Sequence, residues 1–198
     1  MKLNGKINGK GREYYNDGKL EFEGEYLNGY RWNGKGYNKN GIIDLYIKNG
    51  NEKVKQYFYE NDKLEFEGKY LNGERNGKGK EYNIDGKLVF EGEYLNGERW
   101  NGKLKDYYFN GVLEFEGEYI NGKRNGKGKE YYCNGKLEFE GEFLNDKRNG
   151  EGKDYYDDDT LEFRGQYLNG ERWNGKAYDK NGLMKYQIKN GKCIRLIN

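Results

Sequence analysis

The chain contains no histidine and no proline, and it has only two cysteines among its 198 residues. Without histidine, general acid–base chemistry would fall to carboxylates or lysine. Cys133 and Cys193 occupy unrelated places in the sequence pattern, so we expect free thiols in a reducing compartment, not a disulfide or a zinc site. No phosphate-binding loop, metal cluster or nucleophile–base set is visible, and the sequence predicts no catalytic residue, no metal and no cofactor.

Long apolar runs are also missing. None follows Met1, and no stretch of about 18 apolar residues occurs anywhere, so we expect neither a signal peptide nor a membrane-spanning helix. We therefore expect a cytoplasmic protein, with peripheral attachment to a membrane as the alternative. The 36 basic and 34 acidic residues leave a net charge of +2, which provides no field for nucleic acid.

What the chain does contain is one motif, repeated. The sequence LEFEGEY at Leu20–Tyr26 recurs with small changes about every 24 residues, apart from one longer gap. The copies begin at Leu20, Leu64, Leu88, Leu113, Leu137 and Leu161. Self-similarity at a fixed period of this size is typical of repeat architectures. The longer gap holds a degenerate copy around Ile42–Gly50, and the C-terminal region repeats that degenerate pattern.

Each copy predicts one β-hairpin. In the copy that begins at Leu113, apolar residues and glycine alternate with glutamates up to Tyr119, which is the period of a strand with one polar face. Asn121-Gly122 predicts a turn, and a second alternation follows through Gly128. Glycine recurs too often for a helix, and no helical apolar stripe is present.

A register can be predicted from the charges. Pairing Tyr119 with Gly126 and Gly117 with Gly128 leaves a four-residue loop over residues 121–124. Glutamates then lie opposite lysines on one face, which adds a few tenths to about 1 kcal/mol for each pair. The other face carries aromatic side chains and a glycine pair, over which we expect a ring to lie. Tyr131 and Tyr132 point to opposite faces unless a bulge intervenes, and the pattern does not decide between the two.

The composition favours a single layer. Hydrophobic residues make up 33% of the chain and aromatic residues 17%, which is too little aliphatic side chain for a two-layer core but too much tyrosine for disorder. We predict an all-β fold: an elongated single-layer antiparallel β-meander of about eight hairpins, one for each 24-residue repeat. Residues 1–198 form one array, with a partial N-terminal cap repeat at 1–19, repeats at 20–178 and a C-terminal cap repeat at 179–198.

The unit resembles the MORN repeat (membrane occupation and recognition nexus). The resemblance lies in Phe115-Glu-Gly-Glu-Tyr119, the Asn121-Gly122 turn and Gly126-Lys-Gly128, and the continuation over 129–137 is similar to the variant found in bacteria and some protists. Many family members have His-Gly where this chain has Asn-Gly, as at Asn125. The resemblance implies an antiparallel meander that serves as a scaffold or binding surface, and phospholipid binding has been associated with the family.

Two sets of aromatic residues are candidate partner-binding residues. Three tryptophans share an Arg-Trp-Asn-Gly segment that is one residue longer than the Arg-Asn-Gly of other copies. They are either anchors for a partner or rings that fold over an adjacent glycine, and we favour the second interpretation. The tyrosines of the aromatic face either form the core or line an open groove. The candidates are Trp32, Trp100, Trp173, Tyr70, Tyr94, Tyr119 and Tyr167.

The glutamates recur in every copy opposite lysines, whereas a catalytic pair would be singular and sequestered. The leading hypothesis is therefore a non-enzymatic repeat scaffold that binds a protein partner or associates with itself. The first alternative is a peripheral module that binds phospholipid headgroups. A further alternative is a binder of the bacterial antitoxin or immunity type, because some relatives of the variant repeat carry that label.

Overall fold

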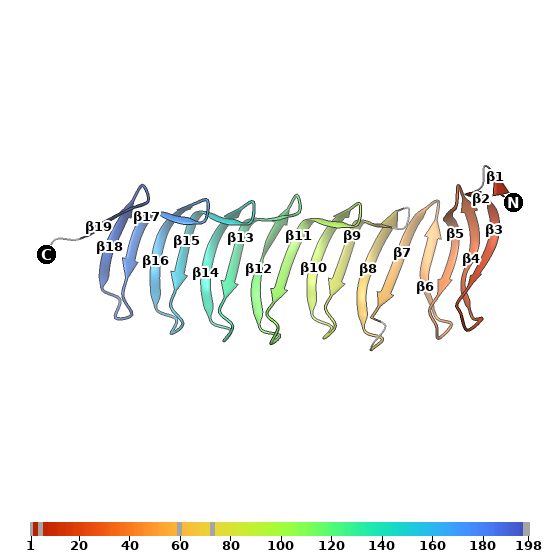
Figure 1. Cartoon of the computed structure of the whole chain (residues 1–198), viewed down its shortest axis with the longest axis horizontal. Helices are drawn as coiled ribbons and strands as arrows, with labels where there is room; N and C mark the ends of the chain where they lie inside the picture. The colour runs from red at the N-terminus through yellow and green to blue at the C-terminus, as the bar shows by residue number, and fades with distance from the viewer. Residues whose placement is uncertain (1, 4–5, 59–60, 72–73, 196–198) are drawn as a thin grey trace. The chain divides into compact units, whose positions relative to one another are not determined.

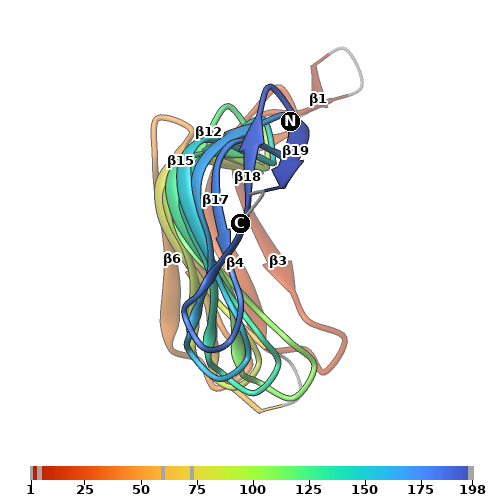
Figure 2. The ribbon, with the colours of Figure 1, turned by 90° about the vertical axis from the view of Figure 1, so that its left-hand side faces the viewer.

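The computed structural model describes residues 2–3, 6–58, 61–71 and 74–195. The chain divides into two units, Met1–Arg99 and Trp100–Asn198, and each unit is described by itself. Within the described residues every regular element is a β-strand. In each unit the strands lie side by side in one layer (Figure 1), and the strands of the second unit bend along their length (Figure 2).

The strands follow the sequence repeat, two for each copy. The first unit contains β1 Lys2–Leu3, β2 Lys6–Ile7, β3 Gly9–Tyr14, β4 Leu20–Leu27, β5 Tyr30–Tyr37, β6 Ile43–Lys48, β7 Asn51–Tyr57, β8 Leu64–Leu71, β9 Glu74–Tyr82 and β10 Leu88–Leu95. β11, Glu98–Tyr107, crosses the boundary between the units. The second unit continues with β12 Leu113–Ile120, β13 Lys123–Tyr131, β14 Leu137–Leu144, β15 Lys147–Tyr155, β16 Leu161–Leu168, β17 Glu171–Tyr178, β18 Met184–Lys189 and β19 Lys192–Arg195.

Consecutive strands pair antiparallel, from β3 to β10 in the first unit and from β11 to β19 in the second. β1 and β2 form a separate short pair. The predicted all-β, single-layer antiparallel meander of hairpins is confirmed.

Tight turns of two residues close the hairpins whose turns lie within the described residues. In the β12–β13 hairpin Asn121 has φ 52° and Gly122 has φ 75°, and Ile120 pairs with Lys123. Two positive φ values are the requirement of a type I′ turn, which matches the twist of the flanking strands and which Asn-Gly satisfies at little cost. The predicted four-residue loop is therefore wrong, because the Asn-Gly turn closes directly.

The extra residues are placed in a bulge instead. Gly117 pairs with Gly128 as predicted, but Tyr119 pairs with Arg124 and not with Gly126. The intervening residues of β13 bulge out, and Gly126 takes φ 94°, a backbone conformation that glycine tolerates. Glu116 still lies opposite Lys129, as predicted.

A second bulge orients the tyrosine pairs. Between β13 and β14 the register shifts at Glu138, so that Glu130 pairs with Phe139 and Tyr131 with Leu137. The Tyr131 hydroxyl donates to Oε1 of Glu116 at 2.8 Å. The Tyr132 hydroxyl instead donates to the backbone oxygen of Tyr155 in the next copy, at 2.7 Å. The first tyrosine therefore binds a glutamate side chain, and the second links its copy to the next.

The core consists of rings laid over glycine. One phenylalanine for each regular copy is completely buried: Phe22, Phe66, Phe90, Phe115, Phe139 and Phe163. A Cβ added to Gly141 would lie 2.6 Å from the ring of Phe139 and 2.7 Å from the Cα of Gly152, so ring and backbone are in close contact. The aromatic ring of the following hairpin packs edge-on against Phe66, Phe115 and Phe139, and Tyr167 lies against Phe139 with centroids 5.2 Å apart.

The degenerate copies have shorter strands, and this changes the alignment of side chains. β6 is six residues long where β4 has eight, and its aliphatic residues Leu45 and Ile47 pack with the Phe22 cluster. Across β6 and β7 the row of paired residues that begins at Phe22 runs on into the glycine pair of Gly68 and Gly79. A residue in a copy before the short copy is therefore aligned, across the strands, with the residue two positions beyond its equivalent in the copy that follows.

The tryptophan segments also differ from prediction. In the β16–β17 hairpin Gly175 pairs with Gly165, and Trp173 is the single residue that bulges between Arg172 and Asn174. Regular hairpins have three bulged residues at this place, so this segment and the corresponding one at Trp32 are shorter than the regular segment, not longer. Counting residues from the arginine to the first glycine made the tryptophan segment look longer. That first glycine is a bulged residue in the regular hairpins but a paired residue in the tryptophan hairpins, so the two counts do not end at equivalent positions.

The contact between ring and glycine predicts a clear mutational effect. Gly141→Ala forces the Phe139 ring and the paired strand apart, and we expect it to reduce the free energy of unfolding by about 2 kcal/mol, measured by urea denaturation. Gly182→Asn is the control: Gly182 has φ 77° and no atom within 4 Å of an added Cβ, and asparagine tolerates such a backbone. Equal losses in the two variants would contradict the proposed role of the ring contact.

Candidate interaction surface

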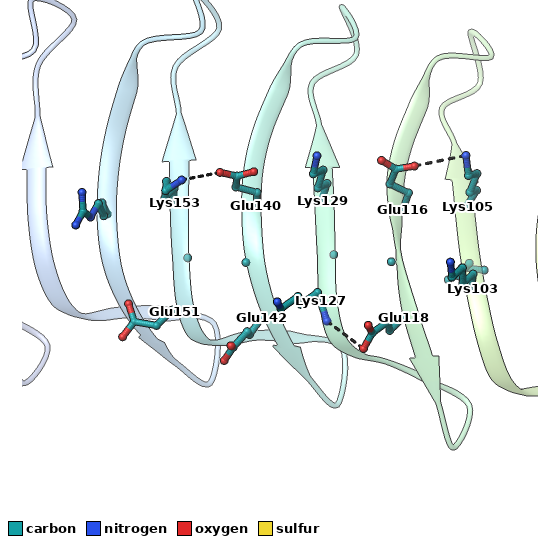
Figure 3. A pocket seen from close by; sticks show the side chains of 16 residues that line it. Lys103, Lys105, Glu116, Glu118, Lys127, Lys129, Glu140, Glu142, Glu151 and Lys153 are labelled. Atoms are coloured by element: carbon teal, nitrogen blue, oxygen red, sulfur yellow. Dashed lines mark hydrogen bonds and ion pairs between the residues drawn. The ribbon is translucent and has the colours of Figure 1, made fainter.

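One face of the sheet is lined with charge, and we call it the charged face. In the second unit two parallel rows of side chains cross its strands (Figure 3). The first row consists of Lys105, Glu116, Lys129, Glu140, Lys153 and Arg164, and the second of Lys103, Glu118, Lys127, Glu142 and Glu151. Neighbours in a row come from adjacent strands and so lie about 4.8 Å apart, and the two rows are separated by about 6.6 Å along a strand.

A groove of about 680 Å³ runs between the rows. Its floor is backbone at Gly117, Gly128, Gly141 and Gly152. Nζ of Lys105 lies 3.4 Å from Glu116, and Nζ of Lys153 lies 2.8 Å from Glu140, as the dashed lines show in Figure 3. These pairs are partly exposed, and each contributes little to stability. The predicted ladder of glutamate and lysine is present, and it remains accessible to a partner.

Tyrosine hydroxyls form hydrogen bonds to the glutamates of the first row. The hydroxyl of Tyr131 donates to Glu116, and that of Tyr155 donates to Glu140 at 2.9 Å. Burial, followed by the hydrogen bond to Glu116, raises the pKa of Tyr131 to about 12. The hydrogen bond from Tyr131 outweighs burial at Glu116 and lowers the pKa of that carboxyl. The first-row glutamates are therefore ionised and held in place at neutral pH.

The opposite face, which we call the ring face, carries a set of stabilising contacts that the sequence did not predict. Arginines cover the buried phenylalanines, and the guanidinium of Arg148 lies 4.3 Å from the ring centroid of Phe139. Such a cation over an aromatic face is stabilising. The same contact recurs in pairs Arg31–Phe22, Arg75–Phe66, Arg99–Phe90, Arg124–Phe115 and Arg172–Phe163.

Carboxylates link these arginines from one repeat to the next. Asp154 is 3% exposed; its Oδ1 accepts from Nη1 of Arg148 at 2.9 Å and its Oδ2 from Nε of Arg172 at 2.6 Å. The hydroxyl of Tyr167 donates to the same carboxylate. Arg148 continues the chain of ion pairs to Glu130, 2.6 Å away. A buried carboxylate between two arginines of successive repeats ties those repeats together.

The first unit contains the same arrangement around Glu81. Nε of Arg99 donates to Oε2 of Glu81 at 2.9 Å, and Nη1 of Arg75 lies 3.2 Å from the other oxygen. Burial alone would raise the pKa of Glu81, but the hydrogen bond and charge of Arg99 hold it below its ordinary value. The pKa of Glu13 is lowered in the same way, with burial opposed by the hydrogen bond from Arg31.

The sequence contained a signal for this network. An arginine follows the hairpin turn of each regular copy, and an acid precedes the tyrosines of most copies. Alternation from Gly128 places Glu130 on the ring face, but only the residues that bulge between Arg148 and Gly152 bring Arg148 within reach of it.

The predicted partner-binding tyrosines occupy two environments. Tyr94 and Tyr167 are buried, and their hydroxyls donate to carboxylates of the network. Tyr70 and Tyr119 are half-buried, and Tyr70 donates to Gln56 at 3.0 Å. A partner role for these four residues stays a prediction, since these contacts lie within the chain.

The three tryptophans are half-buried. A Cβ added to Gly50 would lie 2.7 Å from the Trp32 ring, and one added to Gly191 would lie 3.0 Å from the Trp173 ring. Trp32 and Trp173 therefore lie against the turn glycine of the next hairpin. Whether Trp32, Trp100 or Trp173 also contacts a partner stays a prediction.

Cys133 and Cys193 are exposed free thiols. Within the described ranges no group of three or more histidine, cysteine, aspartate or glutamate side chains is placed to hold a metal ion. The described part of the chain also holds no apolar helix of the length needed to span a bilayer.

The first unit has hollows on both faces, near its short copy. A groove of about 910 Å³ on the charged face is lined by Tyr46, Lys53, Lys69 and Lys78 among others. A hollow of about 980 Å³ opens on the ring face beside Leu45, where the short copy lacks the buried phenylalanine of the regular copies.

These features define the class: a protein of tandem β-hairpins that presents a repeated surface. The model of the MORN repeat matches residues 66–87, 115–136 and 139–160, and the model of the MORN repeat variant matches residues 4–28 and 100–121. The chain belongs to the MORN-repeat family. A comparison with curated proteins found no match. MORN repeats are generally modules for interaction with proteins or membranes.

The arginine–carboxylate network gives a stability prediction. Arg148→Met keeps the length of the side chain but leaves Asp154 with only one arginine, and we expect a loss of about 3 kcal/mol in the free energy of unfolding, measured in urea. Arg12→Met is the control, because the Arg12–Glu23 pair is exposed and should contribute less than about 1 kcal/mol. Similar losses in both variants would contradict the special role of the buried network.

The same network predicts a pH dependence. The pKa values of Glu13 and Glu81 are lowered on folding, so their contribution to stability is complete above the pKa of the unfolded chain, about 4.3, and is lost as the pH falls through the folded pKa. We expect the free energy of unfolding to decrease below about pH 4.5, measured by urea titrations at successive pH values. Glu81→Gln should have a shallower acid limb; a limb of unchanged slope would exclude Glu81 as a contributor.

Proposed function

We propose that this chain is a non-enzymatic scaffold whose charged face binds a protein partner. The observation that carries the proposal is the contrast between the two faces of the sheet. On the ring face, arginines and carboxylates are mostly occupied with one another and with the rings. The charged face is an open groove between rows of accessible charges, repeated at the spacing of the strands.

The geometry favours recognition over chemistry. Each glutamate and lysine of the two rows has close counterparts in neighbouring copies, so no single position is set apart as a reacting centre. Alternating charges of fixed spacing supply specificity and orientation to an encounter more than affinity. A partner that lies along the groove would cross several strands and contact the same pair of rows throughout.

The proposal is tested by a matched pair of variants of the full chain. A partner captured by crosslinking to the wild-type chain is purified, and its binding is measured by calorimetry. Lys129→Ser combined with Lys153→Ser removes two charges from the first row and should weaken binding at least about tenfold. Lys136→Ser combined with Lys180→Ser removes the same amount of charge from the loops that join β13 to β14 and β17 to β18, and should leave affinity within about twofold.

Three outcomes would overturn the proposal. One is equal weakening by both pairs of variants. Another is catalytic turnover by the purified chain that persists through repurification. The third is co-flotation of the chain with anionic vesicles when no protein partner is present, which would favour the membrane alternative.

A further inference from the structure

In the first unit the charged face carries a row in which lysines follow one another over several strands with no glutamate between them. Crossing β5 to β9, one row consists of Lys35, Tyr46, Lys53, Lys69 and Lys78, and we call it the lysine row. The adjacent row across β7 to β10 keeps the alternation, with Lys55, Glu67, Lys80 and Glu91. Glu23 and Glu93 lie at the two ends of the lysine row.

Two features of the chain produce this row. The short copy displaces the rows by two residues, which brings Lys35 of the preceding copy into line with Lys53 and Lys69. The second feature is Lys69 itself: Glu25, Glu93, Glu118 and Glu142 occupy the same position in four other copies. With glutamate at 69, this row would alternate from Lys53 to Lys78, as the adjacent row does from Lys55 to Glu91.

The arrangement is unfavourable to the folded chain by itself. Lys53 and Lys69 lie directly opposite each other on β7 and β8, and like charges in that relation are destabilising. Neither lysine forms an ion pair with another described residue. By contrast Lys80, in the adjacent row, lies 3.2 Å from Glu91. Two uncompensated lysines at this spacing are complementary to a ligand that carries negative charge.

The surroundings indicate what kind of anion fits. Lys53, Lys69 and Lys78 line the groove of about 910 Å³, and two exposed apolar side chains, Tyr46 at 55% and Ile42 at 62%, lie at its end. A ligand that lies over the lysine row meets positive charge along its length and an aromatic ring within the row, whereas a ligand centred in the groove also meets Glu67 and Glu91 of the adjacent row. Acidic side chains interspersed with apolar ones satisfy both.

The ligand must also be narrow. A flat bilayer surface or a nucleic-acid duplex laid on this face would meet Glu67 and Glu91 in the adjacent row as well as the lysines. Only a single chain that follows one row contacts the lysines without those carboxylates. From β5 to β9 the row spans about 19 Å, the length of about six residues of extended polypeptide.

We propose that the lysine row is the docking site for an extended acidic segment of a partner protein, about six to eight residues long, with an apolar side chain seated against Tyr46. This inference rests on the proposed function and names the chemistry of the partner at one part of the charged face.

The test uses the full chain and a fluorescein-labelled peptide of about eight residues in which glutamate alternates with tyrosine. Fluorescence polarisation should show saturable binding that weakens several-fold between about 50 and about 300 mM salt, because the charges are exposed. Lys69→Glu should reduce the affinity at least about tenfold. It restores the alternation, so its thermal unfolding temperature should be equal to or above that of the wild type, which separates lost binding from lost folding.

Lys147→Glu is the matched control. Lys147 is an exposed lysine at the start of β15, outside the lining of the groove in the second unit, and the substitution changes the net charge equally; affinity should stay within about twofold. Equal losses in the two variants, or no peptide binding by the wild type, would overturn the inference. So would binding of phosphatidylserine vesicles that depends on Lys69 while the peptide fails to bind. If the first-row variants lose the captured partner while Lys69→Glu retains it, the proposed function holds and the inference alone is wrong.

Discussion

The packing of a phenylalanine ring on a pair of glycines is the contact on which the rest of this structure depends. A single sheet has no second layer to cover it, so its apolar surface must be covered by side chains of the sheet itself. Phe139 lies flat enough over Gly141 and Gly152 that a single added carbon would collide with ring and backbone. Glycine at these positions therefore makes the core possible, and the completely buried ring is a large part of the apolar core of its copy.

The two faces follow from that contact. With the rings against the backbone, the arginine of each hairpin can reach over its phenylalanine and meet carboxylates from neighbouring strands, which closes the ring face with internal ion pairs such as those of Asp154. The alternate residues of the same strands are left on the other side with backbone between them. One face is thereby used for cohesion between repeats, and the other remains available for recognition.

Much of this was predictable from the sequence. Alternation around Gly117, the Asn-Gly turns and the repeated LEFEGEY motif predicted the hairpins, the pairing of Gly117 with Gly128 and the glutamate–lysine ladder, because each depends on residues near one another in the chain. The bulges were not predictable, since the same residues from Arg124 to Gly128 allow a four-residue loop or a tight turn with displaced residues. The arginine–carboxylate network was missed for that reason: Glu130 and Glu138 reach Arg148 only through bulges. The lysine row depends on a displacement of register that only the pairing of β6 and β7 reveals.

That displacement has a consequence for any partner that reads the surface. In a perfectly periodic array, a ligand shifted by one repeat would find the same contacts. The surface would then not determine which repeat the ligand occupies. The short copy interrupts this periodicity. The row of paired residues that starts at the residue after Phe22 ends at Lys69, which lies two positions further along its own copy than the equivalent residue. The repeat is interrupted there, so this location in the first unit presents an arrangement of side chains that the regular copies do not share.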